Sequence, residues 1–407
     1  MGPLAGVKII DLTAVLMGPY ATQFLGDFGA DVIKIEPPKG DLVRSIGPSR
    51  SPGMGPIFLN ANRSKRSIVI DLKKAEGRAL LLDLCREADA LVYNVRPAAM
   101  ARLGLSYEEV SAINPRIVYA GLYGYGQDGQ YAKRPAYDDL IQGGATLGYL
   151  FNLSGSPEPR YVPAAIADRI VGLTALSGIL AALLERHKTG RGQRVDVPMF
   201  ETMVSFILGD HLGGLTFDPP LDKGGYPRQL AKDRKPFRTS DGYVCALVYT
   251  DEHWQRFVQA IGEPDLMERD PRFANFSSRM EHVDHVYGWL KELFLTRTSA
   301  EWIALLDEND IPVMAMHTFE TVLEDPHLSQ VGFFQRVTHP SEGDIISMAN
   351  PVLMSGKPTQ TNRLAPVLGE HTVEVLRDMG KDEGQIAELL EQGIVAAPSA
   401  PLAAKRG

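Results

Sequence analysis

The first 200 residues alternate between short apolar runs and helical segments, and this alternation limits the fold more than any other feature of the chain. Val7 to Leu12 is an apolar run rich in β-branched residues, and Tyr20 to Phe28 carries apolar side chains at helical spacing. Asp31 to Glu36 then forms a second strand-like run. Because two parallel strands must be joined by a crossover, usually a helix, this opening predicts a parallel α/β unit.

The same alternation continues along the chain. Helical segments alternate with the further apolar runs, which predicts an α/β domain with a doubly wound parallel sheet. The further predicted strands are Ser67 to Leu72, Ala90 to Asn94 and Arg116 to Tyr123, and the helices are Glu76 to Ala88 and Tyr107 to Ile113.

A change of composition divides the chain near residue 220. Asp218 to Arg238 is dense in proline, glycine and charge and has no periodic apolar pattern, which is typical of a linker. Residues 1–220 are therefore predicted to form a large α/β domain. Residues 221–330 are predicted to form the linker and a smaller α+β domain, which begins with a hairpin at Phe237.

The segment from Asp168 to Arg186 is apolar nearly all round and predicts a long buried helix that stops at Gly190. Asp168 stands where an irregular segment meets this helix. One interpretation is structural, because aspartate is a common helix N-cap. The other is catalytic, because the positive end of a helix stabilises a carboxylate nucleophile and the charge that develops on a carbonyl it attacks.

Composition excludes several classes of function. The net charge of −8 argues against nucleic acid as a partner. Cys85 and Cys245 show no metal or redox spacing, and the opening residues resemble neither an export signal nor a membrane span. We therefore expect a cytoplasmic protein without a membrane partner or a metal site.

Two groups of residues could bind a phosphorylated ligand. Gly124, Gly126 and Gly129 match the dinucleotide fingerprint, but no helical pattern opens inside the glycines, so an NAD-dependent oxidoreductase is the weaker hypothesis. Basic and polar side chains also gather at the predicted carboxyl ends of the strands, where ligands bind in such sheets. They are Lys73, Asn94, Arg96, Arg102, Lys133 and Arg134.

Four longer motifs resemble one known family, the class III CoA-transferases, over essentially the whole chain. The family includes formyl-CoA transferase and carnitine CoA-transferase, with the α-methylacyl-CoA racemases as close relatives. The motifs are Ile10-Asp-Leu-Thr13 with Gly18-Pro19, Gly29-Ala-Asp-Val-Ile-Lys-Ile-Glu36, Asn62-Arg-Ser-Lys-Arg-Ser67 with Ile70-Asp-Leu-Lys73, and Gly178-Ile-Leu-Ala-Ala-Leu183 with Gly190-Arg-Gly-Gln193.

The resemblance implies an interlocked-ring homodimer in which residues 331–407 return to the large domain. It implies that Asp168 is the nucleophile, which forms anhydride and aspartyl-CoA thioester intermediates between an acyl-CoA donor and a carboxylic acid acceptor. Coenzyme A is then a substrate, and no tightly bound cofactor is expected. The positions that match CoA contacts of the family are Val15, Leu16, Met17, Ile70, Asp71, Leu72, Lys73, Asn94, Val95, Arg96, Arg102, Arg134 and Tyr137.

Two alternatives stay open within this resemblance. The racemases carry a histidine at the position of Tyr137, and a neutral tyrosine is a poor base near pH 7, so we expect transfer without exchange of an α-proton. A protein that binds CoA without catalysis is the second alternative, because a fold does not guarantee chemistry.

Overall fold

The computed structural model describes residues 2–356 and 363–398 and divides the chain into two units. The first unit combines residues up to 145, residues 162–205 and the chain from 326 onward. The second combines residues 146–161 and 206–325. Residues 146–161 and 206–220 belong to the second unit, although the composition of the chain predicts them in the large domain. There the helix Leu147–Leu153 packs against the helix Pro227–Leu230.

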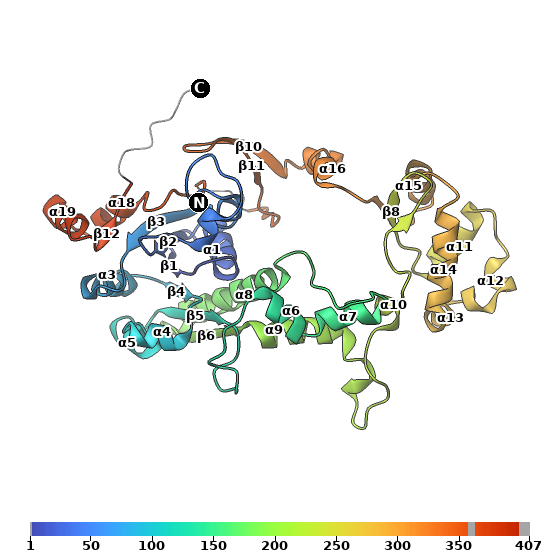
Figure 1. Cartoon of the computed structure of the whole chain (residues 1–407), viewed down its shortest axis with the longest axis horizontal. Helices are drawn as coiled ribbons and strands as arrows, with labels where there is room; N and C mark the ends of the chain where they lie inside the picture. Colours follow the sequence, from blue (N-terminus) through green and yellow to red (C-terminus); the bar gives the residue numbers. More distant parts are fainter. Residues whose placement is uncertain (1, 357–362, 399–407) are drawn as a thin grey trace. The chain divides into compact units, whose positions relative to one another are not determined.

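The first unit is built on a seven-stranded sheet in the order β12-β3-β2-β1-β4-β5-β6 (Figure 1). All neighbouring strands are parallel except the short edge strand β12, which runs antiparallel to β3. The predicted parallel α/β sheet is therefore confirmed. Its strands are β1 (Lys8–Leu12), β2 (Asp31–Glu36), β3 (Lys65–Ile70), β4 (Ala90–Tyr93), β5 (Val118–Tyr123), β6 (Arg194–Pro198) and β12 (Val395–Ala396).

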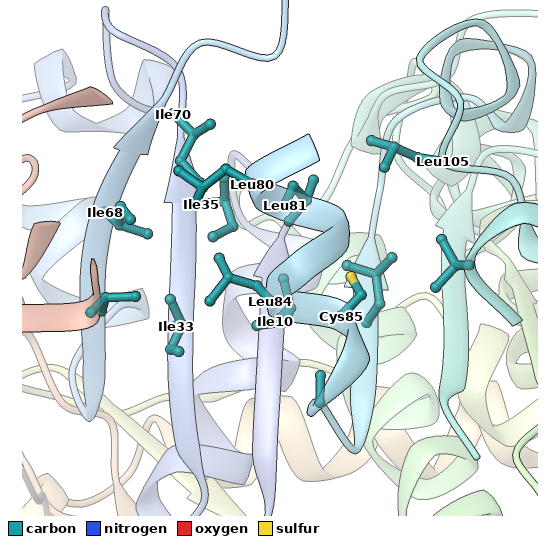
Figure 2. Packing of buried hydrophobic residues seen from close by; sticks show 14 of the residues in the cluster. Ile10, Ile33, Ile35, Ile68, Ile70, Leu80, Leu81, Leu84, Cys85 and Leu105 are labelled. Atoms are coloured by element: carbon teal, nitrogen blue, oxygen red, sulfur yellow. The ribbon is translucent and has the colours of Figure 1, made fainter. Parts of the chain in front are cut away.

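Helices cover both faces of this sheet because its strands are buried on both faces. One face is apolar, and the other also holds the charged side chains of Asp11, Lys34 and Lys65. On one face, Leu80, Leu81 and Leu84 of α3 pack against Ile10 and Ile33 of the central strands (Figure 2). The helices of the unit are α1 (Met17–Asp27), α2 (Pro56–Ala61), α3 (Ala75–Arg86), α4 (Pro97–Arg102), α5 (Tyr107–Ile113), α6 (Asp138–Gly144), α8 (Ile166–Thr189), α17 (Pro326–Gln330), α18 (Thr372–Asp378) and α19 (Glu383–Glu391), with a hairpin of β10 (Phe334–His339) and β11 (Gly343–Met348).

On the opposite face, α8 packs against α1, β5 and β6. Helices α8 and α1 approach closely at Gly172. A Cβ atom at this position would lie 2.7 Å from the carbonyl oxygen of Met17 in α1. Within a single chain the predicted burial is found only on the inner side of α8. Its outer face, including Leu173, Ser177 and Leu184, is exposed. By length and composition alone α8 could cross a membrane.

The second unit contains a small antiparallel sheet in the order β7-β8-β9 and a set of helices with an aromatic core. Trp254, Phe257, Phe294 and Trp302 lie at the centre of that core. The elements are α7 (Leu147–Leu153), α10 (Pro227–Leu230), β7 (Phe237–Arg238), β8 (Tyr243–Ala246), α11 (Asp251–Ala260), α12 (Leu266–Arg269), α13 (Phe276–Glu281), α14 (Val283–Phe294), α15 (Ser299–Glu308), β9 (Val313–Ala315) and α16 (Phe319–Leu323), and α9 (Met199–His211) spans the boundary between the units.

Candidate active site

The loop between β1 and α1 is held by side chains from distant parts of the sequence. The amide of Asn94 brackets Ala14, because its Oδ1 accepts the Ala14 N–H at 2.9 Å and its Nδ2 donates to the Ala14 carbonyl oxygen at 2.7 Å. Val15 has a positive φ of 68°, which is strained for a β-branched residue. Its N–H donates to the carboxylate of Asp41 at 3.0 Å, which holds this conformation in place.

Buried charges anchor the start of the same loop. Lys65 Nζ lies 2.9 Å from Asp11 Oδ2, and Lys34 Nζ lies 3.1 Å from Asp41 Oδ2, with all four side chains buried. Lys34 also donates to the carbonyl oxygen of Thr13 at 2.8 Å. Burial alone raises the pKa of Asp11, but Lys65 and Lys34 outweigh this effect and lower it to about 2. The loop is therefore fixed by ionised groups inside the sheet.

Asp168 lies in the first turn of α8, close to the beginning of α1. The next residue, Arg169, places its guanidinium 4.2 Å from the centre of the Tyr20 ring in α1. The backbone N–H of Asp168 donates to Asp138 Oδ1 at 2.9 Å. Burial and the neighbouring Asp138 carboxylate raise the pKa of Asp168 to about 6, and Arg169 opposes this shift.

A carboxylate in this position can act as a nucleophile or as a base. It is ionised at neutral pH, it lies where the partial positive charge of a 24-residue helix is concentrated, and its raised pKa makes it more basic than an ordinary aspartate. The structural interpretation of Asp168 as the N-cap is wrong, because the N-cap is Ala165 and Asp168 is the third helical residue. Asp138, which is not among the residues predicted from the sequence, is the carboxylate that contacts the main chain of Asp168 and raises its pKa.

The residues predicted after β3 differ in their accessibility. Ile70 is in the core, with 1% of its surface exposed, and its main chain pairs with Val395 of β12. Its side chain cannot reach a ligand. Asp71 and Leu72 are half-buried, and Lys73 is exposed at the carboxyl edge of the sheet.

The residues predicted after β4 and β5 are mostly exposed. Arg96 donates to the carbonyl oxygen of Lys133 at 3.4 Å, which brings these two basic segments together. The Arg134 guanidinium stacks 4.0 Å from the centre of the Tyr131 ring. Val95, Arg102 and Tyr137 are exposed as well, and Tyr137 is 69% exposed.

The glycine-rich loop has a structural partner. The N–H of Gly126 donates to Glu201 Oε1 at 2.8 Å, and a Cβ atom at this position would lie 2.6 Å from the same oxygen. In a dinucleotide site the corresponding N–H groups face a pyrophosphate at the start of a helix. Here a carboxylate occupies that place, and the next helix begins only at Asp138.

Potential metal ligands do not cluster in the described part of the chain. Among residues 2–356 and 363–398, no three histidine, cysteine, aspartate or glutamate side chains are arranged to hold a metal ion.

Comparisons with known proteins agree with this fold. A family model described as CoA-transferase family III matches residues 4–372. An acyl-CoA transferase of Fusarium pseudograminearum (strain CS3096) is 35% identical over 405 residues, which cover 97% of this chain and 88% of that protein. A formyl-CoA:oxalate CoA-transferase of Bradyrhizobium sp. (strain ORS 278) is 32% identical over 424 residues, which cover 97% of this chain and 98% of that protein.

The fold also matches a solved structure. The crystal structure of a CAIB/BAIF family protein from Brucella suis is 30% identical and superposes with a TM-score of 0.78, covering 93% of this chain and 99% of that one. These matches confirm the resemblance found in the sequence motifs. The chain therefore belongs to the class III CoA-transferase family, and it is a CoA-transferase enzyme.

Proposed function

We propose that the protein transfers coenzyme A from an acyl-CoA donor to a carboxylic acid through covalent intermediates on Asp168. The Asp168 carboxylate attacks the donor thioester, the C–S bond breaks, and an acyl-aspartyl anhydride and CoA thiolate form. The thiolate attacks the Asp168 carbonyl carbon, which releases the donor acid and leaves an aspartyl-CoA thioester. The acceptor carboxylate then attacks this carbon, and the released thiolate takes the acceptor acyl group and restores Asp168.

The observation that carries this proposal is the placement of the Asp168 carboxylate. It is partly shielded from water at the amino end of α8, and its pKa of about 6 lies below neutral pH. It is therefore ionised, yet more nucleophilic than a carboxylate of ordinary pKa. Each transfer is an exchange between a carboxylate and a thiolate, so no step consumes a proton.

Racemisation is less well supported, because it requires two bases on opposite faces of an α-carbon. Tyr137 stands where the racemases carry histidine, and this residue is 69% exposed. A neutral phenol near pH 7 does not remove an α-proton readily.

The covalent step is tested by trapping. Wild-type protein is incubated with a panel of acyl-CoA thioesters that includes formyl-CoA, treated with hydroxylamine, and digested for mass spectrometry. A hydroxamate on Asp168 is expected, because hydroxylamine cleaves both the anhydride and the thioester. The same incubation in deuterated water with a chiral 2-methylacyl-CoA is expected to show no deuterium at the α-carbon. Rapid deuterium incorporation without a hydroxamate would instead indicate a racemase.

The pH dependence of adduct formation follows from the pKa of Asp168. As the pH falls through about 6, the carboxylate becomes protonated and the rate is expected to fall. Replacing Asp138 with asparagine removes a negative charge that raises this pKa, so the acidic limb should move to lower pH, whatever happens to the maximal rate. If the acidic limb of the pH–rate profile stays at the same pH in Asp138→Asn, Asp138 does not raise the pKa of Asp168.

We also propose that the enzyme works as a cytoplasmic homodimer. The outer face of α8 supports this proposal, because it is uncharged from Ile170 to Leu184 and leaves Leu173 and Leu184 43% and 58% exposed. A second copy that covers this face would remove these side chains from water. Light scattering of the purified protein should give the mass of two chains, and a monomeric mass with full activity would contradict the proposal.

A further inference from the structure

Gln142 of α6 is fully buried, and both ends of its amide are engaged. Its Oε1 accepts the N–H of Val162 at 2.9 Å. Its Nε2 donates to Asp138 Oδ2 at 2.6 Å and lies 3.3 Å from the carbonyl oxygen of Ala164. Because one end of the amide faces a donor and the other faces acceptors, only one orientation satisfies all the contacts.

Helix α8 begins without a cap of its own. Ala165 at the N-cap position offers no side-chain acceptor. The free N–H groups of the first turn therefore need a hydrogen-bond acceptor from another part of the chain. Asp138 provides it from α6, because its Oδ1 accepts the N–H of Asp168. A residue on another helix thus performs the capping role at the turn that carries the nucleophile.

The two oxygens of Asp138 therefore have separate partners. Oδ1 faces the main chain of Asp168, and Oδ2 faces the side chain of Gln142. Gln142 also holds Val162 and Ala164, which lead directly into α8. One buried amide thus fixes both the capping carboxylate and the backbone on which Asp168 is carried.

We propose that Gln142 is a positioning residue for CoA transfer and acts through Asp138 and the 162–164 segment to fix the place of Asp168. This inference rests on the proposed role of Asp168 as nucleophile. Without the amide, the Asp138 carboxylate can rotate away, and the first turn of α8 loses its external cap. A displacement of about 1 Å at a reacting group is enough to slow a reaction by about a hundredfold.

The test compares Gln142→Met, which has a similar length and no amide, with a matched variant at another buried amide. Asn114→Leu is that control, because Asn114 donates to the carbonyl oxygens of Cys85 and Ala88 at 2.8 Å before the amino ends of β4 and β5. Both variants should lower the thermal midpoint. Only Gln142→Met should lower kcat, by about ten- to a hundredfold, and the KM for acyl-CoA should change by less than about twofold because Gln142 is not accessible to a ligand.

A gentler variant keeps the inference falsifiable if Gln142→Met does not fold. Gln142→Glu keeps the shape and the acceptor for Val162. Its carboxyl group can share a proton with Asp138 at low pH, but the two carboxylates repel each other once both are ionised, so adduct formation on Asp168 should slow as the pH rises. Wild-type rates of adduct formation in both variants would overturn the inference, as would an equal loss of kcat in Asn114→Leu. Failure to find any adduct on Asp168 of the wild-type protein would instead overturn the proposed function.

Discussion

Replacing Asp168 with asparagine is expected to lower kcat for CoA transfer by at least about a thousandfold, because the covalent intermediates cannot form without the nucleophile. Asparagine has nearly the same shape, and its main-chain N–H can still donate to Asp138. The amide is uncharged and is a poor nucleophile, so no anhydride should form. The measurement is the steady-state rate of CoA transfer between a labelled acid and an acyl-CoA.

The matched control is Asp139→Asn, which removes the same charge from the first turn of α6. Asp139 is exposed, whereas Asp138 beside it faces Asp168. The control should keep a rate within about twofold of wild type, because most surface substitutions have small effects. Both kcat and kcat/KM should fall together in Asp168→Asn, which is the behaviour of a group needed only in the reaction itself. An Asp168→Asn protein that keeps the wild-type rate, or forms a hydroxamate at another carboxylate, would contradict the assignment.

The parallel sheet could be predicted because the relevant information is local. The run Asp31 to Glu36 forms β2 with the predicted limits, and Tyr107 to Ile113 forms α5, where Ser106 and Glu109 make a capping box. Such elements follow from side-chain periodicity and short-range hydrogen bonds. The edge strand β12 has only two residues, and its place beside β3 depends on tertiary packing of the chain end.

Exposure along α8 could not be predicted for a different reason. Ile170 to Leu184 is apolar on all sides, which indicates burial everywhere. In the structure only the side that meets α1, β5 and β6 is covered within the unit. The sequence shows that the outer face carries no charged residue between Ile170 and Leu184. It does not show which part of the protein, if any, covers that face.

The position of Asp168 was visible in the sequence, whereas its surroundings were not. Asp138 and Gln142 are four residues apart, a spacing that pairs side chains on a helix, but α6 is too short to show a clear periodicity. Asn94 is a predicted ligand contact, and in the structure its amide is hydrogen-bonded to the main chain of Ala14, 80 residues away in sequence. Contacts of this kind arise only when the sheet brings distant loops together.

Removing the buried carboxylate of Asp11 is expected to have the largest effect on stability. In Asp11→Ala the ammonium group of Lys65 would stay buried without its counter-ion, although it would still donate to the carbonyl oxygen of Pro19 and to Asn62. Breaking a buried pair by removing one partner costs about 3–5 kcal/mol. The midpoint of urea-induced unfolding should fall accordingly.

An exposed ion pair provides the control for that measurement. Asp83 and Arg86 form a pair on α3 with both side chains about half exposed, so Asp83→Ala should change the free energy of unfolding by only about 0.5 kcal/mol. Equal effects of the two substitutions would show that the buried network does not stabilise the fold.

A double variant separates the charge from the packing. In Asp11→Ala with Lys65→Met no unpaired charge stays buried at this pair, so the double variant should be more stable than Asp11→Ala alone. Activity should not recover with stability, because Asp11 also accepts the N–H of Thr13 at 3.0 Å, and that bond helps to hold the loop that leads to α1. A stable double variant with a raised KM for acyl-CoA would therefore support the expectation that the loop between β1 and α1 contacts the substrate.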